Sequence, residues 1–335
     1  MSAEIANAVS TSEGSPPAST LLSGLNTAQR EAVEHIEGPL LIVAGPGSGK
    51  TRVIVHRIAY LVRVVGVSPA RICAVTFTNK AAREMRDRLA RLLGTQADRL
   101  TAGTFHALCA QILRRDGEAI RLSQEFVIYD TDDQTSVLKR AFDAEQVDPK
   151  RFSPGAVFSA ISRAKAQLID VDTYGKQAAS PYDRIVAKVY ARYQAMLAQS
   201  QAVDFDDLLF KAWVLFRDHP DVLQKYQSRY LHLLVDEFQD TNVAQYALAR
   251  QLAGRQHNIC VVGDPDQAIY SWRSADVRNI LSFQRDFPGA KVVRLETNYR
   301  STPYVLQAAQ GVITTNTQRI QKGLVPHKTG GVPVV

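Results

Sequence analysis

The stretch that decides the fold of this chain is the octapeptide AGPGSGKT, made up of Ala44, Gly45, Pro46, Gly47, Ser48, Gly49, Lys50 and Thr51. It follows the apolar run at 39–43 and precedes 52–58, whose apolar spacing predicts a helix. A strand, a glycine-rich loop and a helix in this order are typical of a phosphate-binding loop. The glycines let backbone N–H groups turn inward toward phosphate oxygens at a helix N-terminus. The sequence therefore predicts a nucleotide-binding α/β domain.

The residue types within the loop indicate its chemistry. Lys50 is expected to reach the β- and γ-phosphates of a nucleoside triphosphate, and the Thr51 hydroxyl is expected to bind Mg²⁺. The usual pattern begins with glycine, where this chain has Ala44, but the residues nearest the phosphates follow the pattern. The alternative is a glycine-rich turn with a chance Lys-Thr pair. A strand and a helix on the correct sides favour nucleotide binding.

Length and composition limit the possibilities. The chain has 335 residues, 45% of them hydrophobic, which indicates a soluble globular protein of two or three domains. No stretch is apolar and long enough to span a bilayer, so we expect no membrane partner and a cytoplasmic location. Residues 1–20 lack a signal-peptide pattern and are expected to form a disordered arm. The net charge of +7 fits a polyanionic partner, although many basic proteins bind no nucleic acid.

A second junction between a strand and a loop carries two acids. The apolar residues at 230–235 lead into Asp236 and Glu237. In nucleotide hydrolases the first acid holds Mg²⁺, partly through water, and the second orients and deprotonates the attacking water. A strand that ends in two acids is common by chance, but its presence in one chain with the phosphate loop favours this function.

A third junction, at 259–273, connects a strand to a polar loop and then to aromatic residues. Gln267 is placed to sense a γ-phosphate through a side-chain hydrogen bond. Tyr270 and Trp272 beside Arg273 are typical of a surface on which unpaired bases stack. The alternative is that both aromatic residues belong to the core, and their position directly after a polar loop argues against it.

Other strand ends carry weaker candidates. Phe77 follows a strand and precedes the polar Asn79, which suits stacking on a base as well as it suits a core phenylalanine. Thr104 and His106 follow another strand and are candidate phosphate contacts. His106 has no partner at metal-binding spacing.

Three candidates concern the nucleotide itself. The amide of Gln29 both donates and accepts hydrogen bonds, as a base edge requires, although alone it would be a surface residue. Arg300 is a candidate arginine finger that neutralises charge in the transition state. Tyr299 is a candidate stacking partner of adenine.

Together these motifs resemble the superfamily 1A helicases of the UvrD, PcrA and Rep type. In chain order they are LNTAQ, AGPGSGKT, AVTFTNKAAREM, GTFHALC, VDFDDLL, VDEFQDT, VVGDPDQAIYSWRSAD and LETNYRS. The resemblance extends from about residue 21 to the end. It implies RecA-like motor domains that hydrolyse ATP to move 3′ to 5′ on single-stranded DNA and to unwind duplexes.

The resemblance also implies a role for each candidate. ATP and Mg²⁺ are the expected cofactors. The catalytic residues would be Lys50, Glu237, Gln267 and Arg300, and Thr51 and Asp236 would hold the metal. Gln29, Arg52 and Tyr299 would bind the nucleotide together with the octapeptide. The single-strand track would comprise Phe77, Asn79, Thr104, His106, Tyr270, Trp272 and Arg273.

The expected fold is α/β, a RecA-like P-loop NTPase domain with a parallel sheet and an inserted all-helical subdomain. Residues 21–111 and 202–290 would form motor domain 1A, 112–201 the helical insertion 1B, and 291–335 the incomplete beginning of domain 2A.

The expected activity is a DNA-stimulated ATPase of DNA repair or replication. It would act on single strands and on junctions with duplex, with repair or replication proteins as partners, and would unwind duplex poorly by itself. Two alternatives are a nucleotide- and DNA-binding module without turnover and the helicase part of a helicase–nuclease.

Overall fold

The computed structural model describes residues 18–254, 257–316 and 320–334, except for the side chains of Ala18, Ser19 and Arg273. The predicted arm falls mostly on residues 1–17, outside the described residues. Its last part is helical, because α1 (Ala18–Leu22) packs on α3 (Lys50–Arg63). Leu21 is only 2% exposed there, so disorder up to residue 20 is wrong. Burial of this leucine outweighs the polar composition around it.

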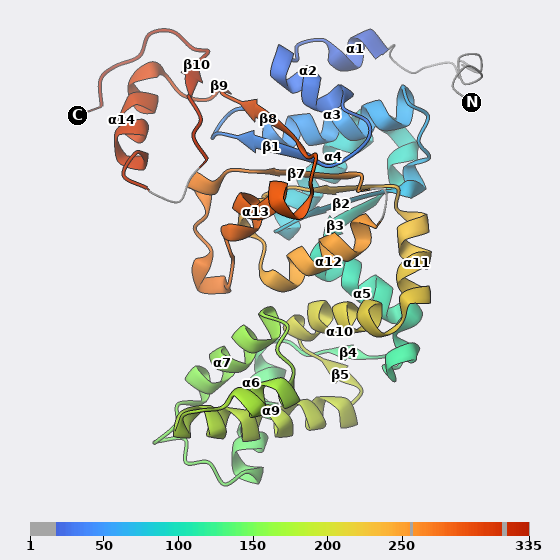
Figure 1. Cartoon of the computed structure of the whole chain (residues 1–335), viewed down its shortest axis with the longest axis vertical. Helices are drawn as coiled ribbons and strands as arrows, with labels where there is room; N and C mark the ends of the chain where they lie inside the picture. Colours follow the sequence, from blue (N-terminus) through green and yellow to red (C-terminus); the bar gives the residue numbers. More distant parts are fainter. Residues whose placement is uncertain (1–17, 255–256, 317–319, 335) are drawn as a thin grey trace.

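A six-stranded parallel sheet forms the centre of the molecule (Figure 1). The strand order is β3-β2-β6-β7-β1-β8. The four inner strands are buried along their whole length, as a sheet covered on both faces requires. The strands are β1 (Leu40–Ala44), β2 (Ile72–Thr76), β3 (Thr101–Thr104), β6 (His232–Val235), β7 (Ile259–Gly263) and β8 (Lys291–Leu295). Because all pairs are parallel, the carboxyl ends of the strands meet at one edge.

Strand β8 lies beyond the predicted boundary at residue 290. Leu40 of β1 pairs with Lys291, and Ala44 pairs with Leu295. The sheet of the first domain therefore includes β8 and extends to residue 295. The pairing of β8 with β1 was not predicted, because parallel pairing between strands far apart in sequence leaves no local pattern.

Helices cover both faces of the sheet. Successive residues of β1 alternate between two apolar cores, with Ile42 in one and Val43 in the other. The first core includes α2 (Thr27–Glu34), α3 and α4 (Asn79–Leu93). The second core includes α5 (Phe105–Asp116), α10 (Phe205–Asp218), α11 (Pro220–Arg229), α12 (Val243–Ala253) and α13 (Arg278–Asp286). No helix in the described ranges has the length and hydropathy needed to cross a bilayer.

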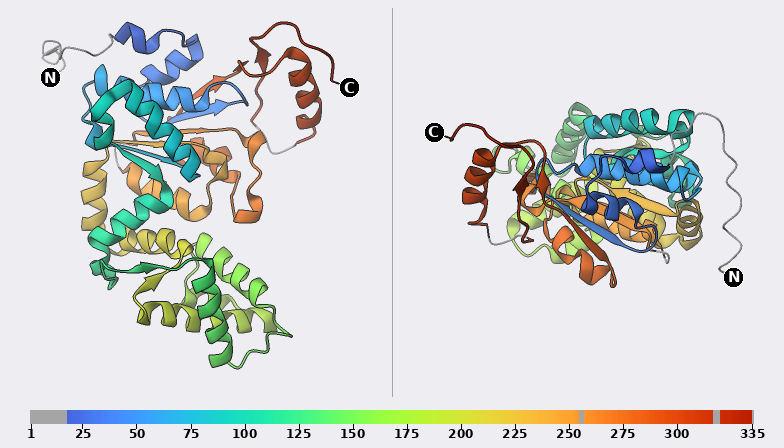
Figure 2. Two further views of the ribbon diagram at one scale, coloured as in Figure 1. Left: turned by 180° about the vertical axis from the view of Figure 1, so that it is seen from behind. Right: turned by 90° about the horizontal axis from the view of Figure 1, so that it is seen from above.

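The helical insertion projects from the sheet domain as a separate layer with its own core (Figures 1 and 2). Its helices are α6 (Thr131–Ala144), α7 (Pro154–Ala166), α8 (Val171–Gln177) and α9 (Pro181–Gln199). The insertion is not wholly helical, because β4 (Val127–Ile128) pairs with β5 (Ala202–Val203) at its base. Helix α5 also crosses the predicted boundary at residue 112, since Ile112 is buried in the core of the sheet domain.

After β8 the chain turns back over the end of the sheet. Strand β9 (Thr297–Asn298) leads to α14 (Pro303–Ile313), and β10 (Val325–Pro326) then pairs with β9 in parallel. Figure 1 shows this last part beside the ends of β1 and β8. The segment that includes β10 therefore lies near the phosphate loop.

A buried ion cluster joins the insertion to the sheet domain. The side chain of Lys165 in α7 is 0% exposed, and its Nζ lies 2.6 Å from Asp204 Oδ2 and 3.0 Å from Asp207 Oδ1. Tyr193 of α9 donates a further hydrogen bond to Asp204 at 3.0 Å. Burial lowers the pKa of Lys165, but the two carboxylates raise it by more, so the net shift is upward.

Replacement of Lys165 by methionine should destabilise the protein, because two buried carboxylates lose their cation. We expect the free energy of unfolding in urea to fall by about 3–5 kcal/mol. The same change at the exposed Lys150 should alter it by less than about 0.5 kcal/mol. Similar values for the two variants would show that the cluster does not stabilise this junction.

Candidate nucleotide and nucleic-acid site

The candidate site lies along the carboxyl ends of β1, β6 and β7. In the loop after β1, Gly47 and Gly49 have φ angles of 68° and 90°. Glycine adopts this left-handed region without the strain that a Cβ would cause. Gly49 caps α3, so Lys50 and Thr51 occupy its first turn, as a phosphate loop requires.

Asn298 holds the phosphate loop from the other side. Its Nδ2 donates to the Pro46 carbonyl at 2.6 Å, and the N–H of Tyr299 donates to the Gly47 carbonyl at 3.0 Å. The Oδ1 of Asn298 accepts from the N–H groups of Arg300 and Ser301. This buried amide thus ties the phosphate loop to the backbone of the candidate arginine finger. Its role was not predicted, and the only local signal was its place between a strand and Tyr-Arg.

Lys50 contacts two other predicted catalytic residues, which come from two other strand ends. Lys50 Nζ donates to Gln267 Oε1 at 2.8 Å and lies 3.2 Å from Glu237 Oε2. Glu237 has a φ of 50°, which is uncommon for a residue with a Cβ and is found often at functional sites. The fourth predicted residue, Arg300, is exposed, and its guanidinium has no hydrogen bond or ion pair with the described residues.

Asp236 and Thr51 supply oxygen atoms at the same place. Asp236 is 3% exposed, and burial together with Glu237 raises the pKa of its carboxyl to about 7, against the opposing effects of Lys50 and Thr51. A carboxylate beside a hydroxyl suits Mg²⁺, which binds oxygen and keeps several waters. Within the described ranges no group of three or more His, Cys, Asp or Glu residues is arranged to hold a metal. Asp236 and Thr51 therefore fit a Mg²⁺ ion that also binds nucleotide phosphates.

Some of the predicted nucleotide-binding residues are buried and donate hydrogen bonds to the backbone of the phosphate loop. Gln29 is 1% exposed, its Nε2 donates to the Ser48 carbonyl at 2.9 Å, and its Oε1 accepts from the Asn26 N–H at 3.2 Å. Ser48 itself donates to the Gly45 carbonyl at 2.7 Å. Ala44 is buried at the end of β1, so its methyl group faces the core.

Two predicted nucleotide contacts lie at the rim of the loop. Arg52 is exposed on the first turn of α3. The Tyr299 hydroxyl accepts from Asn26 Nδ2 at 2.9 Å, and its ring centroid lies 4.8 Å from that of His327. Neither Asn26 nor His327 was predicted. Both contact Tyr299 only because the fold brings these distant parts of the chain together.

Aromatic side chains form a row at the ends of β2 and β7. The ring centroids of Phe77 and Tyr270 are 5.0 Å apart, and those of Tyr270 and Trp272 are 6.3 Å apart. Trp272 is 71% exposed, which excludes the core alternative for this residue. Such a surface suits the stacking of unpaired bases. Asn79 is exposed at the start of α4, and the side chain of Arg273 lies outside the described parts.

The remaining two DNA candidates differ from each other. Thr104 is 7% exposed, and its hydroxyl accepts from the Ala107 N–H as the cap of α5, so it is not a surface contact. His106 is half-buried. Its ring centroid lies 6.5 Å from that of Phe205, and the two rings are nearly perpendicular. Phe205 is 49% exposed and was not predicted. The signal was an apolar residue directly after the helix cap Asp204.

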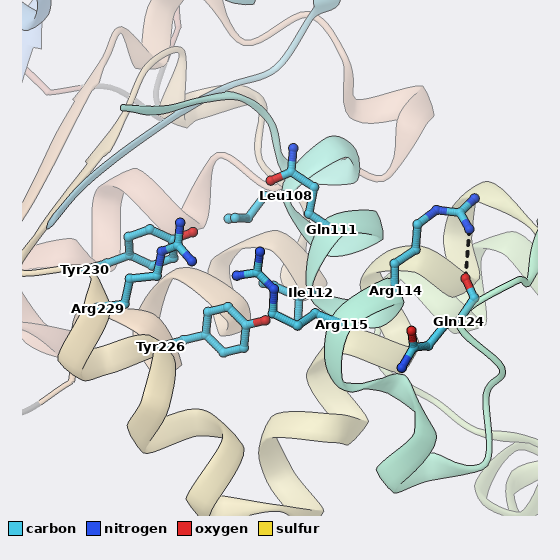
Figure 3. A pocket seen from close by; sticks show the side chains of 9 residues that line it. All are labelled: Leu108, Gln111, Ile112, Arg114, Arg115, Gln124, Tyr226, Arg229 and Tyr230. Carbon is cyan, nitrogen blue, oxygen red and sulfur yellow. Dashed lines mark hydrogen bonds between the residues drawn. The ribbon is translucent and has the colours of Figure 1, made fainter. Parts of the chain in front are cut away.

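A separate pocket lies between α5 and α11 (Figure 3). It is lined by Leu108, Gln111, Ile112, Arg114, Arg115, Gln124, Tyr226, Arg229 and Tyr230. Arg114 donates to the Gln124 carbonyl at 2.9 Å, and the Arg229 guanidinium lies over the Tyr230 ring. None of the predicted site residues lines this pocket, so it is distinct from the site at the strand ends.

The geometry of the loop predicts that Gly47→Ala weakens nucleotide binding. A Cβ at this position would lie 2.6 Å from Arg300 Cβ and 2.9 Å from Asn298 Nδ2, in addition to the strain of a positive φ. We expect the affinity for ATP, measured by calorimetry, to fall at least about tenfold, since left-handed strain alone costs about 1–2 kcal/mol. Gly66→Ala is the matched control, because its φ is 80° and a Cβ there meets nothing within 4 Å. An equal loss in both variants would contradict the clamp by Asn298.

The chain is similar to characterised proteins along most of its length. The family model described as UvrD/REP helicase N-terminal domain matches residues 25–288. The chain is 50% identical over 314 residues to the ATP-dependent DNA helicase PcrA of Bacillus subtilis (strain 168). It is 49% identical over 311 residues to PcrA of Staphylococcus aureus (strain Mu50 / ATCC 700699), and 51% identical over 306 residues to PcrA of Leuconostoc citreum.

These alignments differ in how much of each protein they cover. They include 94%, 93% and 91% of this chain but 42%, 43% and 41% of the three relatives, in the same order. The chain thus spans about two fifths of the length of these relatives. The match to the family model includes the phosphate loop, the Asp-Glu pair and the loop of Gln267. On this evidence the chain belongs to the UvrD/REP helicase family, of the UvrD and PcrA type.

Proposed function

We propose that this chain is the ATP-hydrolysing and DNA-binding part of an ATP-dependent DNA helicase. One observation carries the proposal. The loop after β7 places Gln267 against Lys50 of the phosphate loop and, three residues further on, places Tyr270 in the aromatic row beside the exposed Trp272. A nucleotide sensor and a base-stacking surface on one loop are what a DNA-driven ATPase needs. The names of the relatives, ATP-dependent DNA helicases, agree with it.

In the proposed reaction each residue acts through its observed position. Lys50, now held by Gln267 and Glu237, binds the phosphates as they enter the loop. Glu237 then orients the attacking water and accepts its proton. The exposed guanidinium of Arg300 supplies positive charge to the transition state. A Mg²⁺ ion held by Asp236 and Thr51 would neutralise phosphate charge.

The DNA side follows from the aromatic row. Phe77, Tyr270 and Trp272 bind unpaired bases by stacking, and movement of the Gln267 loop on hydrolysis shifts Tyr270 and Trp272. We propose that the sheet domain is motor domain 1A, that the insertion is 1B, and that the chain after β8 begins domain 2A. Movement in the 3′ to 5′ direction and action in repair or replication belong to the same proposal.

Glu237→Gln tests the catalytic part. The amide cannot accept the proton of water, so the ATPase rate with single-stranded DNA should fall about 100-fold or more while ATP still binds. Glu84→Gln, in the exposed ion pair of α4, should leave the rate unchanged. A wild-type rate that responds neither to DNA nor to Glu237→Gln would favour the module without turnover.

Trp272→Ala tests the DNA part. Loss of one stacking surface should weaken binding of a labelled single-stranded oligonucleotide by about 1–3 kcal/mol, roughly 5- to 150-fold. The affinity for ATP should change little, because Trp272 lies outside the phosphate loop. Tyr304→Ala, which removes another exposed aromatic residue from α14, is the control. Unchanged DNA affinity in Trp272→Ala would contradict the aromatic row as the DNA surface.

A further inference from the structure

Lys322 is buried in the loop that follows β7, although it comes from the segment between α14 and β10. Its side chain is 2% exposed, and its ammonium pairs with both Asp264 and Asp266, at 2.8 Å from Asp266 Oδ2. The side chains of these acids are 0% and 7% exposed. A cation from one end of the chain thus neutralises two acids of the loop that carries Gln267.

The contacts continue from Lys322 to the phosphate loop. The Asp264 carboxylate accepts from Lys322 through Oδ1 and from Gln267 Nε2 through Oδ2. Gln267 Oε1 accepts from Lys50 at 2.8 Å. Because a carboxylate only accepts hydrogen bonds, Asp264 determines which way the Gln267 amide points. Within the described parts of the chain the second N–H of this amide has no hydrogen-bond partner, so it is available to donate to a γ-phosphate oxygen.

The same segment touches the phosphate loop at two other places. A Cβ on Gly45 would overlap with the Leu324 side chain, so Leu324 packs directly on the loop. The ring of His327 lies against Tyr299, the candidate partner of adenine. Residues 322–327 therefore follow the rim of the nucleotide site, and Lys322 is their contact with its sensor.

A role of Lys322 in stability alone does not explain why its ammonium pairs with the two acids beside Gln267. A buried ion pair contributes little to stability compared with apolar residues of the same size. Lys322 also makes no other hydrogen bond or ion pair with the described residues. All its polar contacts lead to Asp264 and Asp266, and from Asp264 to Gln267.

We propose that Lys322 is a positioning residue that orients the Gln267 amide and so makes binding of a γ-phosphate depend on the segment formed by residues 322–327. The inference deepens the proposed function and rests on it. When the segment is in place, Asp264 holds Gln267 in one orientation. When it moves away, two buried acids lose their cation, and the amide loses its fixed partner.

Lys322→Met in the full chain tests the inference through binding rather than turnover. We expect the affinity for Mg²⁺-ATPγS, measured by titration against a fluorescent nucleotide, to fall about tenfold, as expected for loss of one charge-assisted hydrogen bond. The affinity for Mg²⁺-ADP, which has no γ-phosphate, should stay within about twofold. Lys322→Arg keeps the charge and should restore most of the preference for ATPγS.

Controls separate positioning from folding. Lys291→Met removes a lysine from an exposed ion pair with Glu31 and should leave both affinities unchanged. Since Lys322 acts through Gln267, Lys322→Met should add no further loss of ATPγS affinity to Gln267→Ala. Equal losses for ADP and ATPγS in Lys322→Met, or additive losses in the double variant, would overturn the inference while wild-type binding remains. A wild-type chain that binds neither nucleotide would overturn the proposed function, and the inference with it.

Discussion

Parallel pairing of β1 with β7 on one side and with β8 on the other is the constraint on which this structure depends. Parallel strands end at the same edge, so the loops that follow β1, β7 and β8 emerge next to one another. Lys50, Gln267 and Asn298 follow these three strands. Because β1 and β7 are fully buried between two layers of helices and β8 pairs with β1 along its length, the strand ends hold these loops close to one another.

At this edge of the sheet, lysine side chains form direct ion pairs with the neighbouring acids. Lys50 lies between Glu237 and Gln267, and Lys322 lies between two acids of the next loop. Burial and the neighbouring Glu237 raise the pKa of Asp236 to about 7. The carboxyl group of Asp236 and the hydroxyl of Thr51 are oxygen donors that fit the Mg²⁺ ion of the proposed function.

The insertion is attached to the sheet domain by a buried ion cluster rather than by pairing within the large sheet. Its apolar core is separate from the two cores of the sheet domain, and Lys165 forms buried ion pairs with Asp204 and Asp207. Such an ion cluster tolerates little change of geometry, because moving one partner leaves a buried charge. It therefore fixes the base of the insertion, where β4 and β5 also pair.

The sequence by itself determined the α/β fold class, and it predicted strands before the phosphate loop, the Asp-Glu pair and the loop of Gln267, together with roles for Lys50, Asp236, Glu237 and Gln267. These follow from local rules: apolar runs become buried strands, glycines permit left-handed turns, and acids or amides at strand ends face the catalytic edge. The position of Tyr270 and the exposed Trp272 outside the core was predicted because both residues follow a polar loop.

Only the tertiary structure decided which distant residues meet. The pairing of β8 with β1, the Asn298 clamp, the contact of Phe205 with His106 and the burial of Lys322 all join parts of the chain that carry no shared local pattern. Tertiary packing also buries Gln29 and Thr104, which were predicted as ligand contacts. The Gln29 amide donates to the phosphate loop, and the Thr104 hydroxyl caps α5. A residue type states what a side chain is able to bind, whereas its burial and partners decide what it does bind.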